Sequence, residues 1–162
     1  MASAYKAFLG GTCGKSNWRN WLNDRLNEAG RDTSGLFNPV VPNWNEAAQK
    51  LEDEVKATAP LQVYYLGDPQ DVVGFSIYSL FEAVQALYEE KPGVVLQYLR
   101  RIFGWSPKQR TIVALDSTGM PDHLVKVMNK IYKDLAPKFP GQVFLGFDAL
   151  VGFLTAELPK AE

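Results

Sequence analysis

The feature that most constrains the fold is a regular alternation of short apolar segments with longer segments of helical spacing. The predicted strands span residues 5–9, 35–39, 61–66, 111–116 and 142–145. The predicted helices span residues 17–29, 45–58, 76–89, 121–135 and 148–158. Parallel strands need a long crossover connection, which is usually a helix, so this alternation predicts a parallel sheet with helices on both faces.

In a chain of 162 residues this order predicts a single α/β domain over 1–162. We expect a three-layer flavodoxin-like fold with a five-stranded parallel sheet. The segment 93–103 can be read in two ways. Val94 to Leu96 resembles a strand, but Val95, Tyr98, Leu99 and Ile102 recur at helical spacing, which favours a helix.

Composition narrows the classes of partner. Hydrophobic residues make up 46%, the formal net charge is −1, and no basic stripe interleaves with aromatics, so nucleic-acid polymers are not expected to bind. Cys13 is the only cysteine and His123 the only histidine, which argues against disulfides, zinc clusters and a histidine triad. We expect no metal and no cofactor. With no signal-peptide pattern and no apolar run of about 20 residues, we expect no membrane partner and a cytoplasmic location.

The segment Gly10 to Ser16 resembles a phosphate-binding loop between a strand and a helix. The full motif needs a glycine at position 9, where Leu9 stands, so the loop is one residue short. Asp68 and Asp116, which follow apolar strands, are the acids that such a loop would use to hold a metal. Gly10 and Gly11 have two readings, a tight turn or a close approach of backbone to a ligand.

Glu82 stands where an open α/β sheet places its chemistry. The third strand is followed by a polar turn and then by a helix that begins with small and hydroxylated residues. Ligands of such sheets bind outside the carboxyl ends of the strands. Taken alone, a glutamate on a helix is usually solvated. The helix is expected to bury the stripe Ile77, Leu80, Phe81, Val84 and Leu87.

Three segments in order resemble the nucleoside 2-deoxyribosyltransferase-like proteins. They are residues 9–19, with Leu9-Gly10-Gly11-Thr12 and Asn17-Trp18-Arg19, residues 37–44, with Asn38-Pro39 and Asn43-Trp44, and residues 74–83, ending in Phe81-Glu82-Ala83. A weaker match continues through 111–116 and 141–154. The resemblance covers nearly the whole chain, apart from residues 91–109, which we predict to be an insertion.

The resemblance implies cleavage or exchange at the N-glycosidic bond of a deoxynucleoside or deoxynucleotide. Glu82 is the implied nucleophile, forming a covalent glycosyl-glutamate. Asp68 and Asp71 are the nearest candidates for the acids that hold sugar hydroxyls or protonate the base. Ser76 stands near the place of the family's usual acid, which is a departure. The expected substrate-binding residues are Gly10, Gly11, Thr12, Asn38, Trp44, Ser76 and Ser79.

The family also implies a homo-oligomer, because a neighbouring subunit often completes the site. Trp44 could stack on a planar base or pack its loop onto the core, and both readings stay open. The missing acid near Ser76 and the unmatched insertion leave a second hypothesis. On that reading the chain is a catalytically silent nucleotide-binding or partner-binding module on the same fold.

Overall fold

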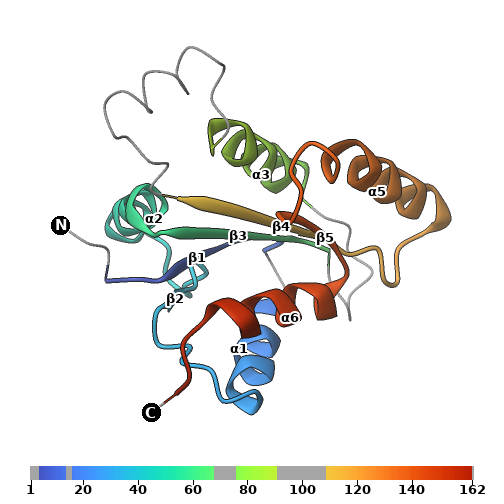
Figure 1. Ribbon diagram of the computed structural model, residues 1–162. Coiled ribbons are helices and arrows are strands. Elements are labelled where there is room, and N and C mark those ends of the chain that lie inside the picture. Colours follow the sequence, from blue (N-terminus) through green and yellow to red (C-terminus); the bar gives the residue numbers. More distant parts are fainter. Residues whose placement is uncertain (1–3, 14–15, 68–75, 91–108, 162) are drawn as a thin grey trace, which may run out of the picture.

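One parallel sheet forms the centre of the molecule (Figure 1). The computed structural model describes residues 4–13, 16–67, 76–90 and 109–161. The strands are β1 (Ala7–Gly11), β2 (Leu36–Phe37), β3 (Leu61–Leu66), β4 (Arg110–Leu115) and β5 (Val143–Leu145). Their order is β2-β1-β3-β4-β5, and every neighbouring pair is parallel. This is the flavodoxin-like order, so the predicted fold class is confirmed.

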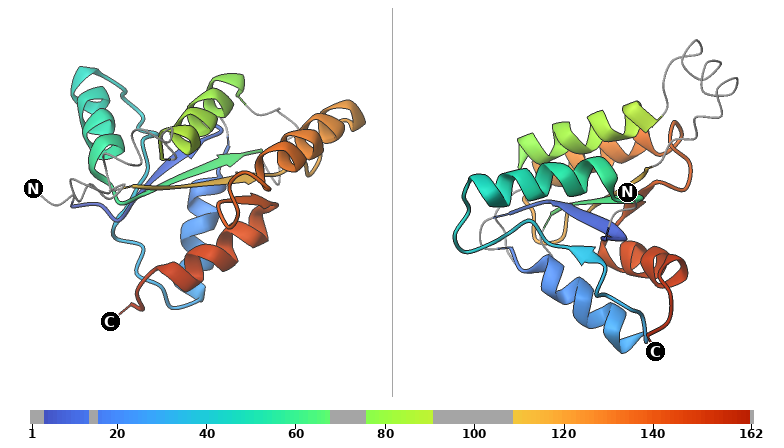
Figure 2. Two further views of the ribbon diagram at one scale, coloured as in Figure 1. Left: turned by 45° about the horizontal axis from the view of Figure 1, so that its top comes forward. Right: turned by 90° about the vertical axis from the view of Figure 1, so that its left-hand side faces the viewer.

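Helices cover both faces of the sheet, as Figures 1 and 2 show from three directions. The helices are α1 (Trp18–Glu28), α2 (Glu46–Thr58), α3 (Ile77–Glu90), α5 (Asp122–Leu135) and α6 (Phe147–Glu157). On one face α1 and α6 pack through Trp18, Leu22 and Leu154. On the other face α2, α3 and α5 pack through Val55, Leu87 and Met128, so two separate apolar layers flank the sheet.

The predicted elements lie close to the observed ones. Helix α1 has Asn17 as its N-cap, and the Ser16 hydroxyl is buried without a hydrogen-bond partner in the described part of the chain. Asn45 does cap α2, accepting a bond from the Ala48 amide at 3.0 Å. The ambiguous segment 93–103 and most of the insertion at 91–109 lie outside the described residues.

The prediction for the buried face of α3 is wrong at two positions. Ile77 and Phe81 are 67% and 70% exposed, whereas Ser79, Ala83 and Leu87 are buried. Small side chains let the helix approach the sheet closely, and the Ser79 hydroxyl donates to the carbonyl of Gly11 at 3.1 Å. The helix is therefore rotated from the expected orientation. As a result Glu82, next to Ala83, is half-buried beside the sheet rather than turned to solvent.

No helix in the described ranges is both long enough and apolar enough to cross a lipid bilayer.

Candidate functional site

A cavity of about 460 Å³ opens at the end of β1, between α2 and α3. Here the chain order reverses, since β2 lies on one side of β1 and β3 on the other. Such a switch point is where open α/β sheets bind their ligands. The predicted site residues that line the cavity are Gly10, Gly11, Trp44, Ser76, Ser79 and Glu82. The structure therefore brings together six residues that the sequence singled out.

Close packing against β3 explains why β1 ends in two glycines. A Cβ atom on Gly10 would lie 2.6 Å from the ring of Tyr64. A Cβ atom on Gly11 would lie 2.1 Å from the carbonyl oxygen of Tyr65, and the φ of Gly11 is +114°. Both glycines are thus required by the sheet itself, and their backbone also forms one wall of the cavity.

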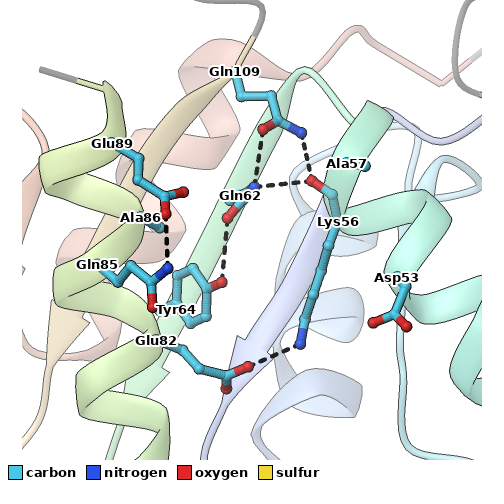
Figure 3. A pocket seen from close by; sticks show the side chains of 10 residues that line it. All are labelled: Asp53, Lys56, Ala57, Gln62, Tyr64, Glu82, Gln85, Ala86, Glu89 and Gln109. Carbon is cyan, nitrogen blue, oxygen red and sulfur yellow. Dashed lines mark hydrogen bonds and ion pairs between the residues drawn. The ribbon is translucent and has the colours of Figure 1, made fainter. Parts of the chain in front are cut away.

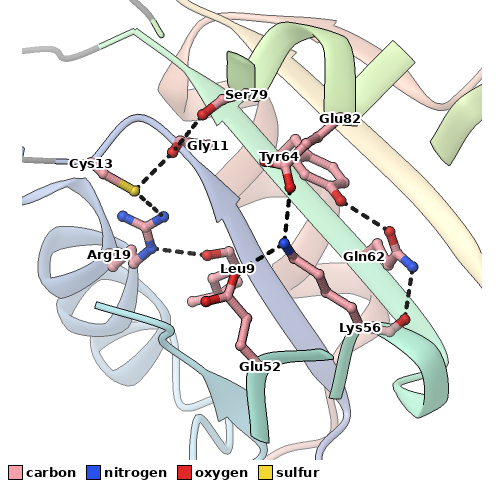
Figure 4. Close-up of polar contacts among 10 residues, drawn as sticks. All are labelled: Leu9, Gly11, Cys13, Arg19, Glu52, Lys56, Gln62, Tyr64, Ser79 and Glu82. Atoms are coloured by element: carbon pink, nitrogen blue, oxygen red, sulfur yellow. Dashed lines mark hydrogen bonds and ion pairs between the residues drawn. The ribbon is translucent and has the colours of Figure 1, made fainter. Parts of the chain in front are cut away.

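Glu82 forms an ion pair with Lys56 across the cavity (Figures 3 and 4). The Lys56 Nζ atom lies 2.9 Å from Oε1 of Glu82 and 2.9 Å from Oε1 of Glu52, one turn earlier on α2. The three side chains are 21–26% exposed. The same ammonium group lies 5.1 Å from the ring centroid of Phe8. Lys56 therefore bridges two carboxylates over an aromatic ring at the floor of the site.

Burial and the charges of this cluster shift the pKa of Lys56 and of the nearby Tyr64. Burial alone would lower the pKa of Lys56, but its hydrogen bonds to Glu82 and Glu52 outweigh that effect and raise the pKa well above its usual value. The ammonium group therefore stays charged over the whole neutral range. Burial also raises the pKa of the Tyr64 phenol well above its usual value, and the negative charge of Glu82 adds to the effect.

A second, smaller cavity of about 330 Å³ lies on the other side of the ion pair (Figure 3). Asp53, Lys56 and Glu82 line both cavities, so the ion pair stands between them. Gln62 and Gln109 donate to the Lys56 carbonyl near the end of α2, where helix carbonyls lack partners. These bonds fix the last turn of α2 over β3 and so hold Lys56 opposite Glu82.

Arg19 organises the loop that follows β1. Its Nε atom donates to the Leu9 carbonyl and its Nη1 atom to the Thr12 carbonyl, both at 2.9 Å. Its Nη2 atom lies 3.8 Å from the Cys13 sulfur, and its guanidinium packs 4.5 Å from the Trp18 ring centroid. Burial lowers the pKa of this side chain, which is only 3% exposed. Arg19 thus holds the backbone beside the cavity with two of its five N–H groups.

Two of the expected substrate-binding residues do not line the cavity. The Thr12 hydroxyl accepts a bond from the Gly67 amide at 3.1 Å, which joins the ends of β1 and β3. The Asn38 side chain accepts a bond from the Val40 amide at 3.0 Å, a local turn contact. The structure uses both side chains to hold loops. Asp68 and Asp71 lie outside the described residues, so their catalytic roles stay predictions.

Asp116, the acid considered for a metal, serves as a buried anchor. It accepts bonds from the Tyr65 hydroxyl at 2.7 Å, the Thr118 amide at 2.9 Å and the Phe147 amide at 3.1 Å. Burial would raise its pKa, but these hydrogen bonds outweigh it and lower the pKa below its usual value. Gly14 and Lys15 of the partial phosphate-loop motif lie outside the described ranges, within which no three candidate metal ligands group together.

Sequence reasoning missed Lys56 and Glu52. The two residues are four apart on a helix rich in charges, a spacing that is typical of a solvent-exposed pair. Only the packing of α2 beside α3 brings Lys56 within reach of Glu82. The single signal in the sequence was this i, i+4 pair, which is too common on helix surfaces to indicate a site. His123, by contrast, is exposed in the first turn of α5, as a lone surface histidine would be.

Comparisons with protein-family models, with curated proteins and with solved structures found no match to this chain.

Proposed function

We propose that this protein cleaves or exchanges the N-glycosidic bond of a deoxynucleoside or deoxynucleotide, with Glu82 as the nucleophile. The observation that carries the proposal is the placement of the Glu82 carboxylate. It is half-buried, lines a cavity at the switch point of the sheet, and is held by Lys56 at 2.9 Å. A volume of about 460 Å³ lies in the range of small-molecule sites.

The chemistry follows from the charges in the cluster. Glu82 accepts a bond from an ammonium group as a carboxylate, which is the form that attacks carbon. Attack on C1′ of the sugar forms a glycosyl ester and releases the base. Water or a second base then attacks C1′ and frees Glu82, as in a retaining glycosidase. The glycosyl ester carries no charge, so Lys56 has no ion pair with Glu82 in the intermediate. The ion pair with Glu52 then holds Lys56 in place.

The remaining wall of the cavity suits the other parts of a nucleoside. Ser76 and Ser79 bring hydroxyl groups near Glu82, which supports contact with sugar oxygens. Trp44 and Tyr78 bring aromatic surfaces to the same cavity, which supports stacking with a planar base. Asp68 and Asp71, which lie outside the described residues, remain the proposed acids, with the role that the family resemblance implies.

The test is base release and base exchange. The protein is incubated with deoxynucleosides and deoxynucleotides, each with and without free adenine or cytosine, and the products are separated by chromatography. We expect free base or exchanged nucleoside, and a loss of at least about 10³-fold in Glu82→Gln. Glu89→Gln is the matched control, since Glu89 lies on the same helix and is exposed. No release and no exchange with any substrate would refute the proposal, and a wild-type rate in Glu82→Gln would place the nucleophile elsewhere.

A catalytically silent binding module is the second candidate. Lys56 binds both Glu82 and Glu52, an arrangement that also suits a purely structural ion-pair cluster. On this reading nucleosides or nucleotides raise the melting temperature but are recovered unchanged. Turnover of any of them that depends on Glu82 would exclude the module.

The proposal includes a homo-oligomer in the cytoplasm. Ile77, Tyr78 and Phe81 are 67%, 72% and 70% exposed at the start of α3, beside the cavity. An exposed apolar cluster of this kind favours association with another surface. Light scattering after size-exclusion chromatography measures the oligomer, and Phe81→Glu should dissociate it. A monomeric wild-type protein would refute this part.

A further inference from the structure

The wall of the cavity carries charged side chains of both signs. Glu52, Asp53 and Glu82 line the cavity together with two cations, Lys56 and Arg19. Lys56 is bound between two of the carboxylates, and Arg19 donates to two backbone carbonyls. Both cations are thus largely occupied, whereas the Asp53 carboxylate is exposed. The surface offered to a ligand is therefore acidic.

Two aromatic side chains complete this surface. Trp44, just before α2, is 58% exposed, and Tyr78, in the first turn of α3, is 72% exposed. Both line the same cavity as the three carboxylates. The faces of Trp and Tyr rings attract cations, and flat groups stack on them. Carboxylates and aromatic faces in one cavity are the features that bind a flat organic cation.

The described wall also lacks a ready proton donor. A neutral base leaves a sugar easily only when its ring nitrogen is protonated, which is the usual task of a general acid. The raised pKa of Lys56 makes its ammonium group a poor acid at neutral pH. No histidine lines the cavity, because the only one in the chain is on α5. The position near Ser76, where the family resemblance implies an acid, carries a hydroxyl instead.

From these observations we infer that the site acts on N-glycosides whose base already carries a formal positive charge, such as N-alkylpyridinium or N7-alkylated purine glycosides. The inference rests on the proposed role of Glu82. Its carboxylate oxygen bonds to C1′, the C1′–N bond breaks, and the electron pair stays on the ring nitrogen, which becomes neutral. Water then attacks C1′ of the ester and gives the free sugar, the Glu82 carboxylate and one proton in solvent. The departure of a base that is already cationic needs no general acid.

Binding of the base tests the inference without any chemistry. 1-Methylnicotinamide is a flat cation whose methyl group stands for the sugar carbon, and nicotinamide is its neutral counterpart. Isothermal titration calorimetry should show that the cation binds about tenfold more tightly. Trp44→Leu should remove most of that preference, and the exposed control Glu89→Gln should keep it. Equal affinity for the two molecules, tighter binding of nicotinamide, or no binding of either would overturn the inference.

Turnover separates this inference from the proposed function. Base release is measured for 7-methyl-2′-deoxyguanosine and 2′-deoxyguanosine, and for the corresponding ribonucleosides, with Glu82→Gln as the blank for spontaneous loss. General acid catalysis is commonly worth about 10²-fold or more, so the methylated substrate of a pair should react at least about 10²-fold faster. Equal rates within each pair would overturn the inference but leave Glu82 as the nucleophile. Release that is the same in Glu82→Gln for all four substrates would refute the proposed function itself.

Discussion

Replacing Lys56 with methionine tests the ion-pair cluster most directly, because it keeps most of the side chain and removes the charged ammonium group. Glu52 and Glu82 would then face each other without a cation. Each carboxylate oxygen lies 2.9 Å from Nζ of Lys56, so the two oxygens are at most twice that distance apart. At about 5.8 Å and an effective dielectric constant of about 20, two like charges repel by about 3 kcal/mol.

The variant also loses two charge-assisted hydrogen bonds. Water replaces them in part, since the three side chains are 21–26% exposed and the carboxylates can turn toward solvent. Turning outward also relieves part of the repulsion. We therefore expect Lys56→Met to lower the free energy of unfolding at pH 7 by about 2 kcal/mol.

The sign of the pH dependence follows from the same charges. In wild type the pKa of Lys56 is raised on folding, so its stabilising effect is complete below the unfolded value of about 10.4 and is lost only as pH rises through the higher folded value. The difference between wild type and variant should therefore be the same at pH 7 and at about pH 9.

Urea unfolding at pH 7 and at about pH 9 measures the loss of stability and its pH dependence. Lys130→Met is the matched control, because Lys130 forms an i, i+4 pair with Asp134 in which the two side chains are 77% and 57% exposed. That pair should be worth less than about 0.5 kcal/mol. Adding Glu52→Gln to Lys56→Met should restore about 1 kcal/mol. A loss in Lys56→Met no larger than in the control, or one that is much smaller at about pH 9 than at pH 7, would refute this reasoning.

Four further substitutions test two glycines, the buried acid and the exposed tryptophan. Gly11→Ala places a Cβ atom 2.1 Å from a backbone oxygen and should lower the free energy of unfolding by at least about 3 kcal/mol. Gly141→Ala is the control, since Gly141 has a φ of +73° but open space around it, and should lower the same free energy by about 1 kcal/mol. Thermal melts compare the two variants, and similar losses would contradict the packing argument. Asp116→Asn should cost about 2 kcal/mol at pH 7. Because the pKa of Asp116 is lowered on folding, its stabilisation holds above about 3.9 and fades as the pH falls through the folded value, so urea unfolding at pH 7 and pH 3 should show the gap closing. Trp44→Leu should shift the melting temperature by less than about 2 °C, since the ring is 58% exposed, and a larger drop would show that Trp44 packs its loop onto the core.

The strands and their parallel order were predictable because each buried strand is a distinct apolar run, and because alternation with helices permits few topologies. The orientation of α3 was not. The apolar side chains of Ile77 and Phe81 predicted that their face of α3 is buried. Close approach to β1 instead favours burial of the face with Ser79 and Ala83. Residue size at a crowded contact decided the rotation, and hydrophobic spacing does not measure it.

Most of the predicted residues that line the cavity lie at the end of β1 and the start of α3. Gly11 and Glu82 follow from the rule that ligands bind at the carboxyl ends of parallel strands. Lys56 comes from a helix whose partner is set by tertiary packing, so no local pattern pointed to it. Thr12 and Asn38 were expected to bind substrate, but their side chains bond to backbone amides and do not line the cavity. Short polar side chains near turns often bond to backbone in this way.

The pairing of α1 with α6 has a consequence for the order of folding during synthesis. Trp18, Leu22 and Leu26 of α1 are covered by Leu154 and Leu158, and Arg31 bonds to the carbonyl of Leu158, 127 residues further along the chain. The ribosome therefore makes the apolar face of α1 long before it makes the segment that covers it. Until then the nascent chain presents a tryptophan-containing surface to chaperones, and translation stalled after β5 would leave this layer open.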